Sequence, residues 1–481
     1  MRTRTTLVLL IVAALLGAYV LLYDAKRPGT DEQERLAGRL FPEVETPSVE
    51  RLELERPNGS LVLVREDDAY RLLSPIEDAG DRTRCEELIR ELLELRAKGT
   101  RRADAITGGD EATGLGAAAL RALLHTSEQD FALEIGSRPA PGGLRFARMG
   151  QGADIALVPE RAAELLLTPV NGLRERKIFH PSPLEVATLS IRRKNDQLRF
   201  ERREGGRWWI ASPLVDEADP TAVNDLLSDL ASLRADRFAP DDPEATPSKY
   251  GFDAPILRVQ ARGRADNDQE TELLVGRQSD PGSGRYYLRT TGRNAIFEVY
   301  LAATMKSFER PPEAWRSRRI LDFSPWDVAE VELSRGERML RATRIEGENT
   351  PEKSWAVVEG EETDFDPTAL ADLLATLSEI KAQNLAAPDE TRFGRVTARI
   401  ELDFRDPETA APVLLELGAH NPAGGVWTRR EGRETLMLMD EQIAQKIDPE
   451  LLRTKEAEAT ASPLSQAPRS AAPPSESSRI P

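Results

Sequence analysis

The sequence predicts an α+β protein in which an N-terminal transmembrane helix precedes three duplicated domains. Each domain is expected to be a largely antiparallel sheet with a packed amphipathic helix. Three features support this: an uncharged apolar run near the N-terminus, a pattern of strands and one helix that recurs at offsets of about 138–147 residues, and a change of composition near the C-terminus. The expected parts are a membrane anchor (1–25), a linker (26–48), three α+β repeat domains (49–185, 186–326, 327–454) and a disordered tail (455–481).

The expected anchor is the uncharged segment from Thr5 to Tyr23. As an α-helix these residues would rise about 28 Å, close to the ~30 Å hydrocarbon core of a bilayer. A cleaved signal peptide is the alternative, but the apolar run continues past the small pair Gly17 and Ala18. We therefore expect the helix to be retained as a single pass through the cell inner (cytoplasmic) membrane, with lipid as its partner.

The orientation of the chain follows from weaker signals. Arg2 and Arg4 favour a cytoplasmic N-terminus, whereas Lys26 and Arg27 on the other flank oppose this assignment. The sequence has a single cysteine, Cys85, and few thiols suit an oxidising compartment. The soluble region is therefore expected to face the periplasm or the exterior.

Each repeat opens with two strands of alternating polarity, which begin at Val49, Val186 and Val328. A third strand and a helix follow. The helix has apolar residues at i, i+1, i+4 and i+7, a spacing that places them on one helical face. The third strand carries an aromatic residue at the same place in each copy: Tyr70, Trp208 and Trp355. The matched apolar residues of the helix are Leu88, Ile89, Leu92 and Leu95 in the first copy, Leu226, Leu227, Leu230 and Leu233 in the second, and Leu373, Leu374, Leu377 and Ile380 in the third.

Later in each repeat a strand ends in glycine, and an aromatic-x-Arg step and a short apolar strand follow. The matched positions are mostly apolar or turn-forming, so they predict a shared core and shared turns and give no sign of a repeated active site. The glycines are Gly136, Gly276 and Gly418, and the steps are Phe146 with Arg148, Tyr287 with Arg289, and Trp427 with Arg429.

Composition narrows the classes of partner and of site. The net charge of −17 repels phosphate backbones, so no nucleic-acid partner is expected. The same charge also serves solubility. One cysteine permits neither an internal disulfide nor a Cys-rich metal site. From Lys455 onward the Ala-, Pro-, Ser- and Glu-rich composition cannot bury a core, so this segment is expected to be disordered.

Residues that could carry chemistry do not form a recognisable set. His125, His180 and His420 occupy different points of the repeat and lack metal-ligand spacing. Gly114 to Ala119 fits GxGxxA but follows a loop instead of a strand. Ser378 and Lys381 fit SxxK, and the other segments typical of that enzyme class are missing. We therefore predict no catalytic, cofactor-binding or metal-binding residues, no cofactor, and a protein that is not an enzyme.

One residue is a candidate for surface contact. Neighbours in a strand face opposite sides, and Trp208 matches core residues of the other repeats, so Trp209 is expected to face outward. An outward tryptophan can anchor a protein interface or stack on a sugar, and it can equally be covered by a neighbouring domain.

Three segments carry a resemblance to a known family: the ELLVG-type strand, the YGFD-type turn from Tyr250 to Asp253, and the stretch WRSRRILDFSPWDVAEVEL from Trp315. With these features the repeat, over roughly 49–454, resembles the bacterial family called domain of unknown function 4340. At the turn the first copy differs, with Gly114-Leu115-Gly116, and so does the third, with Phe393-Gly394-Arg395. The resemblance implies a membrane-anchored protein associated with gliding-motility-type ABC transporters, and it implies no reaction.

These observations lead to one main functional hypothesis and two alternatives. The main hypothesis is a non-catalytic, membrane-anchored scaffold or auxiliary subunit of an ABC-type membrane transport complex, with membrane transporter proteins as partners. The first alternative is an extracytoplasmic binding module for an envelope polymer such as glycan, with Trp209 as a contact. The second is an enzyme of unrecognised type.

Overall fold

The structure of the protein is a computed structural model. It describes residues 38–41, 44–117, 119–150, 154–194, 196–240, 246–263, 270–345, 355–359, 365–406 and 411–453. The expected anchor and the expected tail lie outside these residues, as does most of the linker. In the part of the chain that is described, no helix combines the length and the apolar character needed to cross a bilayer.

The chain divides into two compact units, and the division passes through the second repeat. One unit takes in the described residues of Met1–Glu185, Ser228–Gln260 and Gln269–Met305. The other takes in those of Val186–Leu227, Ala261–Asp268 and Lys306–Pro481.

Each repeat contributes one antiparallel sheet. The first sheet has nine strands in the order β4-β3-β2-β1-β6-β7-β8-β9-β5. Its strands are β1 (Val49–Arg56), β2 (Gly59–Glu66), β3 (Ala69–Ser74), β4 (Asp78–Gly80), β5 (Gly99–Arg102), β6 (Leu120–Thr126), β7 (Asp130–Ala140), β8 (Leu144–Met149) and β9 (Asp154–Pro159), and its helices are α3 (Arg82–Leu93), α4 (Gly109–Thr113), α5 (Arg161–Leu166) and α6 (Val170–Leu173).

The second sheet repeats this order as β13-β12-β11-β10-β15-β16-β17-β18-β14. Its strands are β10 (Val186–Arg193), β11 (Gln197–Arg202), β12 (Trp208–Ser212), β13 (Asp216–Glu217), β14 (Arg237–Phe238), β15 (Leu257–Gly263), β16 (Glu270–Gln278), β17 (Arg285–Thr290) and β18 (Phe297–Tyr300), with helices α7 (Pro220–Ser232), α8 (Pro247–Tyr250) and α9 (Ala302–Phe308).

The third sheet has the order β21-β20-β19-β23-β24-β25-β26-β22. Its strands are β19 (Val328–Arg335), β20 (Arg338–Arg344), β21 (Trp355–Glu359), β22 (Asn384–Ala386), β23 (Ala398–Phe404), β24 (Val413–His420), β25 (Val426–Arg430) and β26 (Arg433–Met439), and its helices are α10 (Pro367–Glu379), α11 (Glu390–Phe393) and α12 (Glu441–Lys446).

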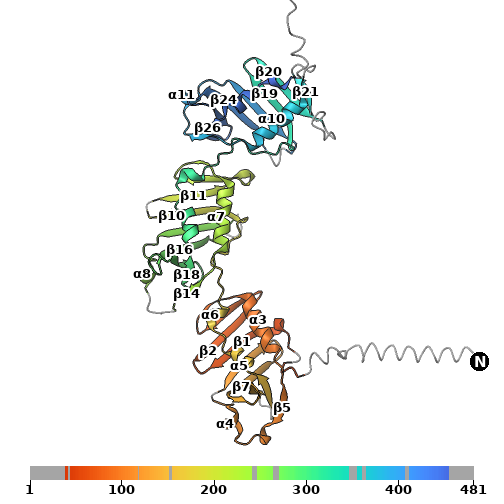
Figure 1. The fold of residues 1–481 in the computed structure, drawn as a ribbon, viewed down its shortest axis with the longest axis vertical. Helices are drawn as coiled ribbons and strands as arrows, with labels where there is room; N and C mark the ends of the chain where they lie inside the picture. The colour runs from red at the N-terminus through yellow and green to blue at the C-terminus, as the bar shows by residue number, and fades with distance from the viewer. Residues whose placement is uncertain are drawn as a thin grey trace, which may run out of the picture. The chain divides into compact units, whose positions relative to one another are not determined.

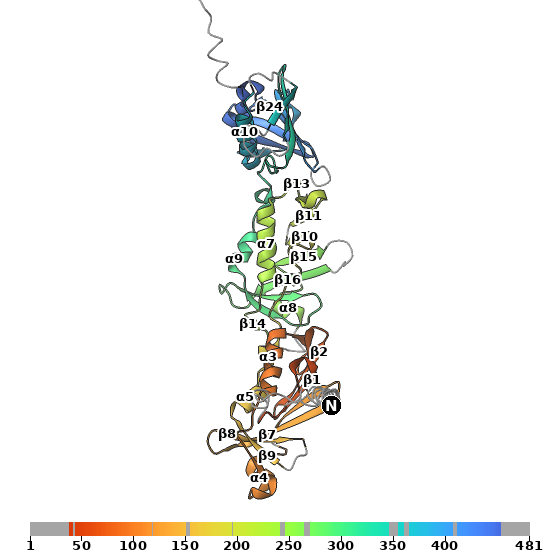
Figure 2. The same ribbon diagram turned by 90° about the vertical axis from the view of Figure 1, so that its right-hand side faces the viewer.

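One helix of each repeat packs on a face of its own sheet, as α3 and α7 show in Figures 1 and 2. The N-terminus of α3 is capped by Asp81, whose carboxylate accepts from the Arg84 amide, and Asp366 caps α10 in the same way. All twelve apolar residues predicted from the i, i+1, i+4, i+7 pattern are buried, but the last of each set, Leu95, Leu233 and Ile380, lies just beyond the end of its helix. The α+β class, the antiparallel sheets and the apolar helix faces are therefore as the sequence predicts.

The three aromatic residues of the third strands are also buried, as predicted. Tyr70, Trp208 and Trp355 are at most 4% exposed. Each packs under the helix that follows it, because the strand alternation directs this position to the core face.

Candidate functional site

Trp209 lies on β12 and points away from the side that buries Trp208. Trp208 is in the core, where its indole Nε1 donates to Asn224 Oδ1 at 3.2 Å. Trp209 is half-buried, and the guanidinium carbon of Arg203 lies 4.2 Å from the centroid of its ring. The predicted outward position is therefore correct, but Arg203 already stacks on the ring.

The three histidines lie apart in the fold. His125 Nδ1 is 2.9 Å from Asp130 across the β6–β7 hairpin, and His420 Nδ1 is 3.5 Å from Glu441. Burial, together with the positive charge of Lys177, lowers the pKa of His180. Within the described ranges no group of three or more His, Cys, Asp or Glu side chains could hold a metal ion.

Cys85 is fully buried on α3, and its Sγ lies 3.7 Å from the Leu173 carbonyl oxygen. Burial raises the pKa of this thiol to about 12. The nucleophilic form of cysteine is the thiolate, which this pKa leaves almost unpopulated at neutral pH. Cys85 is therefore a core residue of α3.

The glycine that ends a strand in every repeat has a steric cause. A Cβ at Gly136 would lie 2.2 Å from the Thr113 carbonyl oxygen, closer than any real contact. The corresponding distances are 2.1 Å from Gly276 to the Tyr250 oxygen and 2.2 Å from Gly418 to the Phe393 oxygen. The strand passes directly over the backbone of a turn, and only glycine permits this approach.

The same turn explains the GxGxxA pattern. Gly114 is the left-handed C-cap of α4, with φ of 71°, and Gly251 and Gly394 follow the other two turns with φ of 81° and 67°. These glycines reverse the chain after a short helix, which is a common role of glycine at this position. Gly114 therefore belongs to the repeat and does not open a dinucleotide site.

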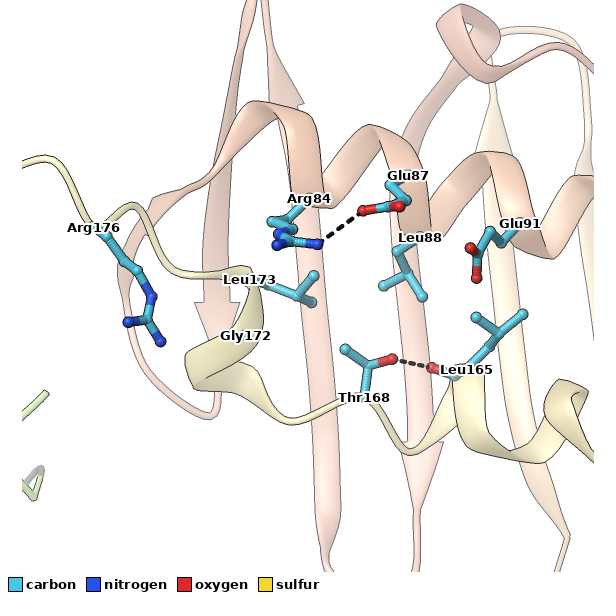
Figure 3. Close-up of a pocket in the computed structure, with 9 residues that line it drawn as sticks. All are labelled: Arg84, Glu87, Leu88, Glu91, Leu165, Thr168, Gly172, Leu173 and Arg176. Carbon is cyan, nitrogen blue, oxygen red and sulfur yellow. Dashed lines mark hydrogen bonds and ion pairs between the residues drawn. The ribbon is translucent and has the colours of Figure 1, made fainter. Parts of the chain in front are cut away.

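One groove lies in the first repeat between α3 and the segment from α5 to Arg176 (Figure 3). It has a volume of about 480 Å³. Leu88, Leu165 and Leu173 form its apolar floor, and Arg84 on its rim donates to Glu87 at 3.1 Å. Glu91 pairs with Arg161, and Arg176 donates to the Ala235 and Asp236 carbonyl oxygens, so these charged groups of the rim already have partners within the protein.

A second groove, of about 640 Å³, lies beside the start of β1 and includes His125. Arg65 on its wall donates to the Pro47 carbonyl oxygen at 2.7 Å. Arg202 and Arg344 hold the start of the first strand in the other repeats, through the Val186 and Val328 carbonyl oxygens at 3.0 and 2.9 Å. The arginine of this groove is thus a repeated structural contact.

The most highly organised charged groups form two buried clusters. In the first ion cluster (Asp78, Arg174 and Arg293), Asp78 Oδ2 accepts from Arg174 Nε at 2.7 Å. Arg293 donates to both carboxylate oxygens, from Nε at 2.9 Å and from Nη2 at 3.0 Å. Arg293 also donates to the carbonyl oxygens of Glu175 and Lys177, at 2.9 and 3.1 Å. Asp78 and Arg174 are each 1% exposed.

The second ion cluster (Asp216, Arg316 and Arg433) has the same geometry. Arg316 Nε donates to Asp216 Oδ2 at 2.5 Å, and Arg433 donates to both carboxylate oxygens at 2.8 and 3.2 Å. Arg433 also donates to the carbonyl oxygens of Ser317 and Arg319, at 2.7 and 3.1 Å. Each arginine thus reproduces a role from the first cluster.

Both clusters bring one carboxylate between two guanidinium groups. Burial alone would raise the pKa of Asp216, but hydrogen bonds and charge from Arg433 and Arg316 outweigh it and hold this pKa below its ordinary value. Each cluster lies within one compact unit. Each joins a carboxylate from one predicted repeat domain, an arginine from the end of that domain, and an arginine from the next.

Both carboxylates were missed from the sequence, although the arginines Arg174 and Arg316 stand in basic segments that end two of the predicted domains. A signal was available: Ser74-Pro75 and Ser212-Pro213 each precede an Asp-x-x-Asp pair, at Asp78 and at Asp216. The second aspartate of each pair accepts a hydrogen bond from a backbone amide at the start of the next helix. The first aspartate is the carboxylate of an ion cluster.

Among solved structures, two DNA polymerase III beta subunits are similar to this chain only at a low level. The one from Thermotoga maritima is 9% identical, covers 85% of this chain and 96% of its own length, and has a TM-score of 0.16. The one from Pseudomonas aeruginosa is 8% identical, with the same coverages and the same TM-score. At these scores neither similarity bears on the fold or the function of this chain. None of the curated proteins matches it.

A family model, described as a domain of unknown function (DUF4340), matches residues 114–255 and 208–394. Together the two segments cover 114–394, which is more than half of the 481 residues. Each begins within one predicted domain and ends within the next. The chain therefore belongs to the family called domain of unknown function 4340.

Proposed function

We propose that the protein is a non-catalytic, membrane-anchored scaffold or auxiliary subunit of an ABC-type membrane transport complex. The observation that carries the proposal is the pair of ion clusters, in which a buried aspartate and two arginines connect successive repeats. A catalytic centre requires a base, a nucleophile or a metal that can reach a substrate. These carboxylates and guanidinium groups instead bind one another and the backbone.

The clusters suit a protein that works by contact. A buried charge that has lost its partner is very costly, so each cluster favours one arrangement of the groups that form it. Repeated domains also multiply surface, and linked weak contacts gain strength through effective concentration. A chain of this kind can hold several partner surfaces together.

The membrane part of the proposal rests on the sequence. The uncharged segment from Thr5 to Tyr23 has the length of a transmembrane helix. The family resemblance implies a neighbourhood of ABC transporters. An anchored scaffold would be confined to the surface in which such a transporter lies.

Glycan binding by Trp209 has less support. Sugar stacking needs a free aromatic face, and the Arg203 guanidinium lies over the ring of Trp209. A sugar would therefore have to displace this arginine or use the other face of the ring.

Purification from native membranes tests the proposal. The full-length chain should co-purify with an ABC permease and its ATPase, identified by mass spectrometry. A chain that lacks residues 5–23 should lose these partners while its circular dichroism is unchanged, and Trp209→Ala should retain them. Absence of transporter subunits would overturn the proposal. Retention of the chain on envelope glycan, with loss of that retention in Trp209→Ala, would support the alternative.

A further inference from the structure

We propose that Glu217 and Arg430 form a specificity pair, which makes the second ion cluster selective for the two repeats that it joins. The inference rests on the proposed scaffold function and concerns the order in which the repeats can connect. The partner surface is the turn that joins β25 to β26 in a following repeat, and its distinguishing group is an arginine at the position of Arg430.

The first and second clusters are matched residue by residue. Gly80 forms an isolated antiparallel β-bridge with Arg174, and Ala218 forms the same kind of bridge with Arg316. Gly80 and Ala218 are therefore equivalent, and so are the residues that precede them, Ala79 and Glu217. In the repeat that supplies the second arginine, Leu288 of β17 pairs with Phe297 of β18, and Thr428 of β25 pairs with Met437 of β26. We take these two pairs as equivalent. Counting two residues along β17 and β25 makes Thr290 the equivalent of Arg430.

The two positions change together. The second cluster has Glu217 with Arg430, and the first has Ala79 with Thr290. Arg430 Nη2 donates to Glu217 Oε2, and Arg433 Nη1 lies 3.7 Å from the same oxygen. Thr290 is buried as well, but its hydroxyl donates to the Glu272 carbonyl oxygen of its own repeat at 3.2 Å.

Burial makes the pair discriminating. The Arg430 side chain is 4% exposed and that of Glu217 is 7%. Arg430 also donates from Nη1 to the Ile320 carbonyl oxygen at 3.3 Å. Burial lowers the pKa of Arg430, and Glu217 acts in the opposite direction by favouring the charged form. An arginine here that faced alanine would be a buried charge without its partner. A glutamate that faced threonine would lose its hydrogen-bonded partner and keep the longer contact to Arg433 Nη1 at 3.7 Å.

The match also extends to the ends of the set. In the sequence, the third repeat has Thr363 at the position of Asp78 and Asp216, and the first repeat has Gly152 at the position of Arg293 and Arg433. The carboxylate therefore occurs in the two repeats that another repeat follows in this sequence. The arginine occurs in the two that another repeat precedes.

Limited trypsin digestion of the full-length protein provides the test. Cleavage after Arg316, Arg318 or Arg319 reports opening at the second cluster. Cleavage after Arg174, Arg176 or Lys177 reports opening at the first and is an internal control in the same molecule. Glu217→Ala and Arg430→Thr should each accelerate cleavage at the second site on the order of a hundredfold, with no change at the first.

The double variant Glu217→Ala/Arg430→Thr recreates the combination found at the first cluster. It should return cleavage at the second site to within about threefold of the parent rate. Conversely, Ala79→Glu should open the first site alone, and Ala79→Glu/Thr290→Arg should close it again.

Double variants that stay as labile as the single ones would overturn the inference, and so would single variants without effect. If a single variant is too unstable to purify, recovery of soluble chain by its double variant is the same test. These readouts need no transporter, so their outcome is separate from that of the co-purification.

Discussion

The glycine contacts and the ion clusters are both repeated, but they differ in how often they occur. The contact between a strand glycine and a turn carbonyl is present in all three repeats. Among the described residues, the cluster of one aspartate and two arginines occurs twice, each time with groups from two successive repeats. A feature found in every copy serves the folding of one domain, whereas a feature found once per connection serves the chain as a whole.

The two features also differ in the forces that maintain them. Gly136 and its equivalents are fixed by steric exclusion, which acts over tenths of an ångström and is the same at any pH. The clusters depend on charge in a buried setting, where a missing partner costs more than the pair itself contributes. Substitutions can therefore separate them.

The largest effect is expected from Asp216→Asn. This change removes the buried carboxylate charge that both Arg316 and Arg433 bind, so it should lower the free energy of unfolding by about 3–5 kcal/mol. Urea unfolding followed by tryptophan fluorescence measures it. The exposed residue Asp225 on α7 offers the control Asp225→Asn, which should change stability by less than about 0.5 kcal/mol. Equal effects of the two changes would refute the role of the cluster.

A substitution in the apolar core of one domain measures how much that core contributes to the free energy of unfolding. Leu230 on α7 is fully buried, and Leu230→Ala should cost about 2–5 kcal/mol through lost apolar contact and the cavity that remains. The equivalent residues Leu92 and Leu377 are also 0% exposed, so the same change at either should have a similar cost. Thermal unfolding with unchanged midpoints in all three variants would contradict the shared core.

The glycine contact should show a smaller effect with a matched control. Gly136→Ala forces the Cβ against the Thr113 carbonyl and should cost about 1–3 kcal/mol. Gly99 lies in β5 of the same sheet and has no heavy atom within 4 Å of an added Cβ. Gly99→Ala should therefore be neutral or slightly stabilising, by up to about 1 kcal/mol. Urea midpoints of the two variants compare them directly.

The sequence predicted the repeated core well because periodicity records burial. The helix of each repeat shows its buried face as a regular spacing, so Leu88, Leu226 and Leu373 could be assigned to the core without a structure. The alternating strands and the buried aromatics Trp208 and Trp355 followed from the same rule. The glycine that ends the later strand was also recognisable in the sequence. Its steric cause could not be inferred without the structure of the turn whose carbonyl oxygen lies against it.

The short edge strands and the clusters could not be predicted in this way. β13 consists of Asp216 and Glu217, which read as surface charges in a sequence and are nearly inaccessible in the fold. Their partners Arg430 and Arg433 lie more than two hundred residues later. A buried charge is recognised by its partner, and long-range partners leave no local pattern. The outward side of Trp209 was predictable from alternation, but the arginine over its ring was not.

Acid should weaken the second ion cluster and leave the glycine contacts intact. The pKa of Asp216 is below its ordinary value because hydrogen bonds and charge from Arg433 and Arg316 outweigh burial, which acts in the opposite direction. For a carboxyl whose pKa is lower in the folded state, the unfolded chain binds the proton first as the pH falls. Its stabilising contribution is then fully present above the unfolded value of about 3.9 and is lost as the pH falls through the folded value.

The consequence is a difference between two variants that depends on pH. Between pH 5 and 7 the gap in unfolding free energy between the parent chain and Asp216→Asn should be constant. Below about pH 4 the gap should shrink, because the unfolded parent chain then binds a proton at this carboxyl while the folded chain does not. The gap between the parent and Gly136→Ala should stay the same over the whole range, since no proton is involved. Urea unfolding of all three proteins at steps of pH from 7 to 3 measures both gaps. A gap for Asp216→Asn that widened in acid would reverse the sign expected for Asp216 and would require a different origin for the stability of the second ion cluster.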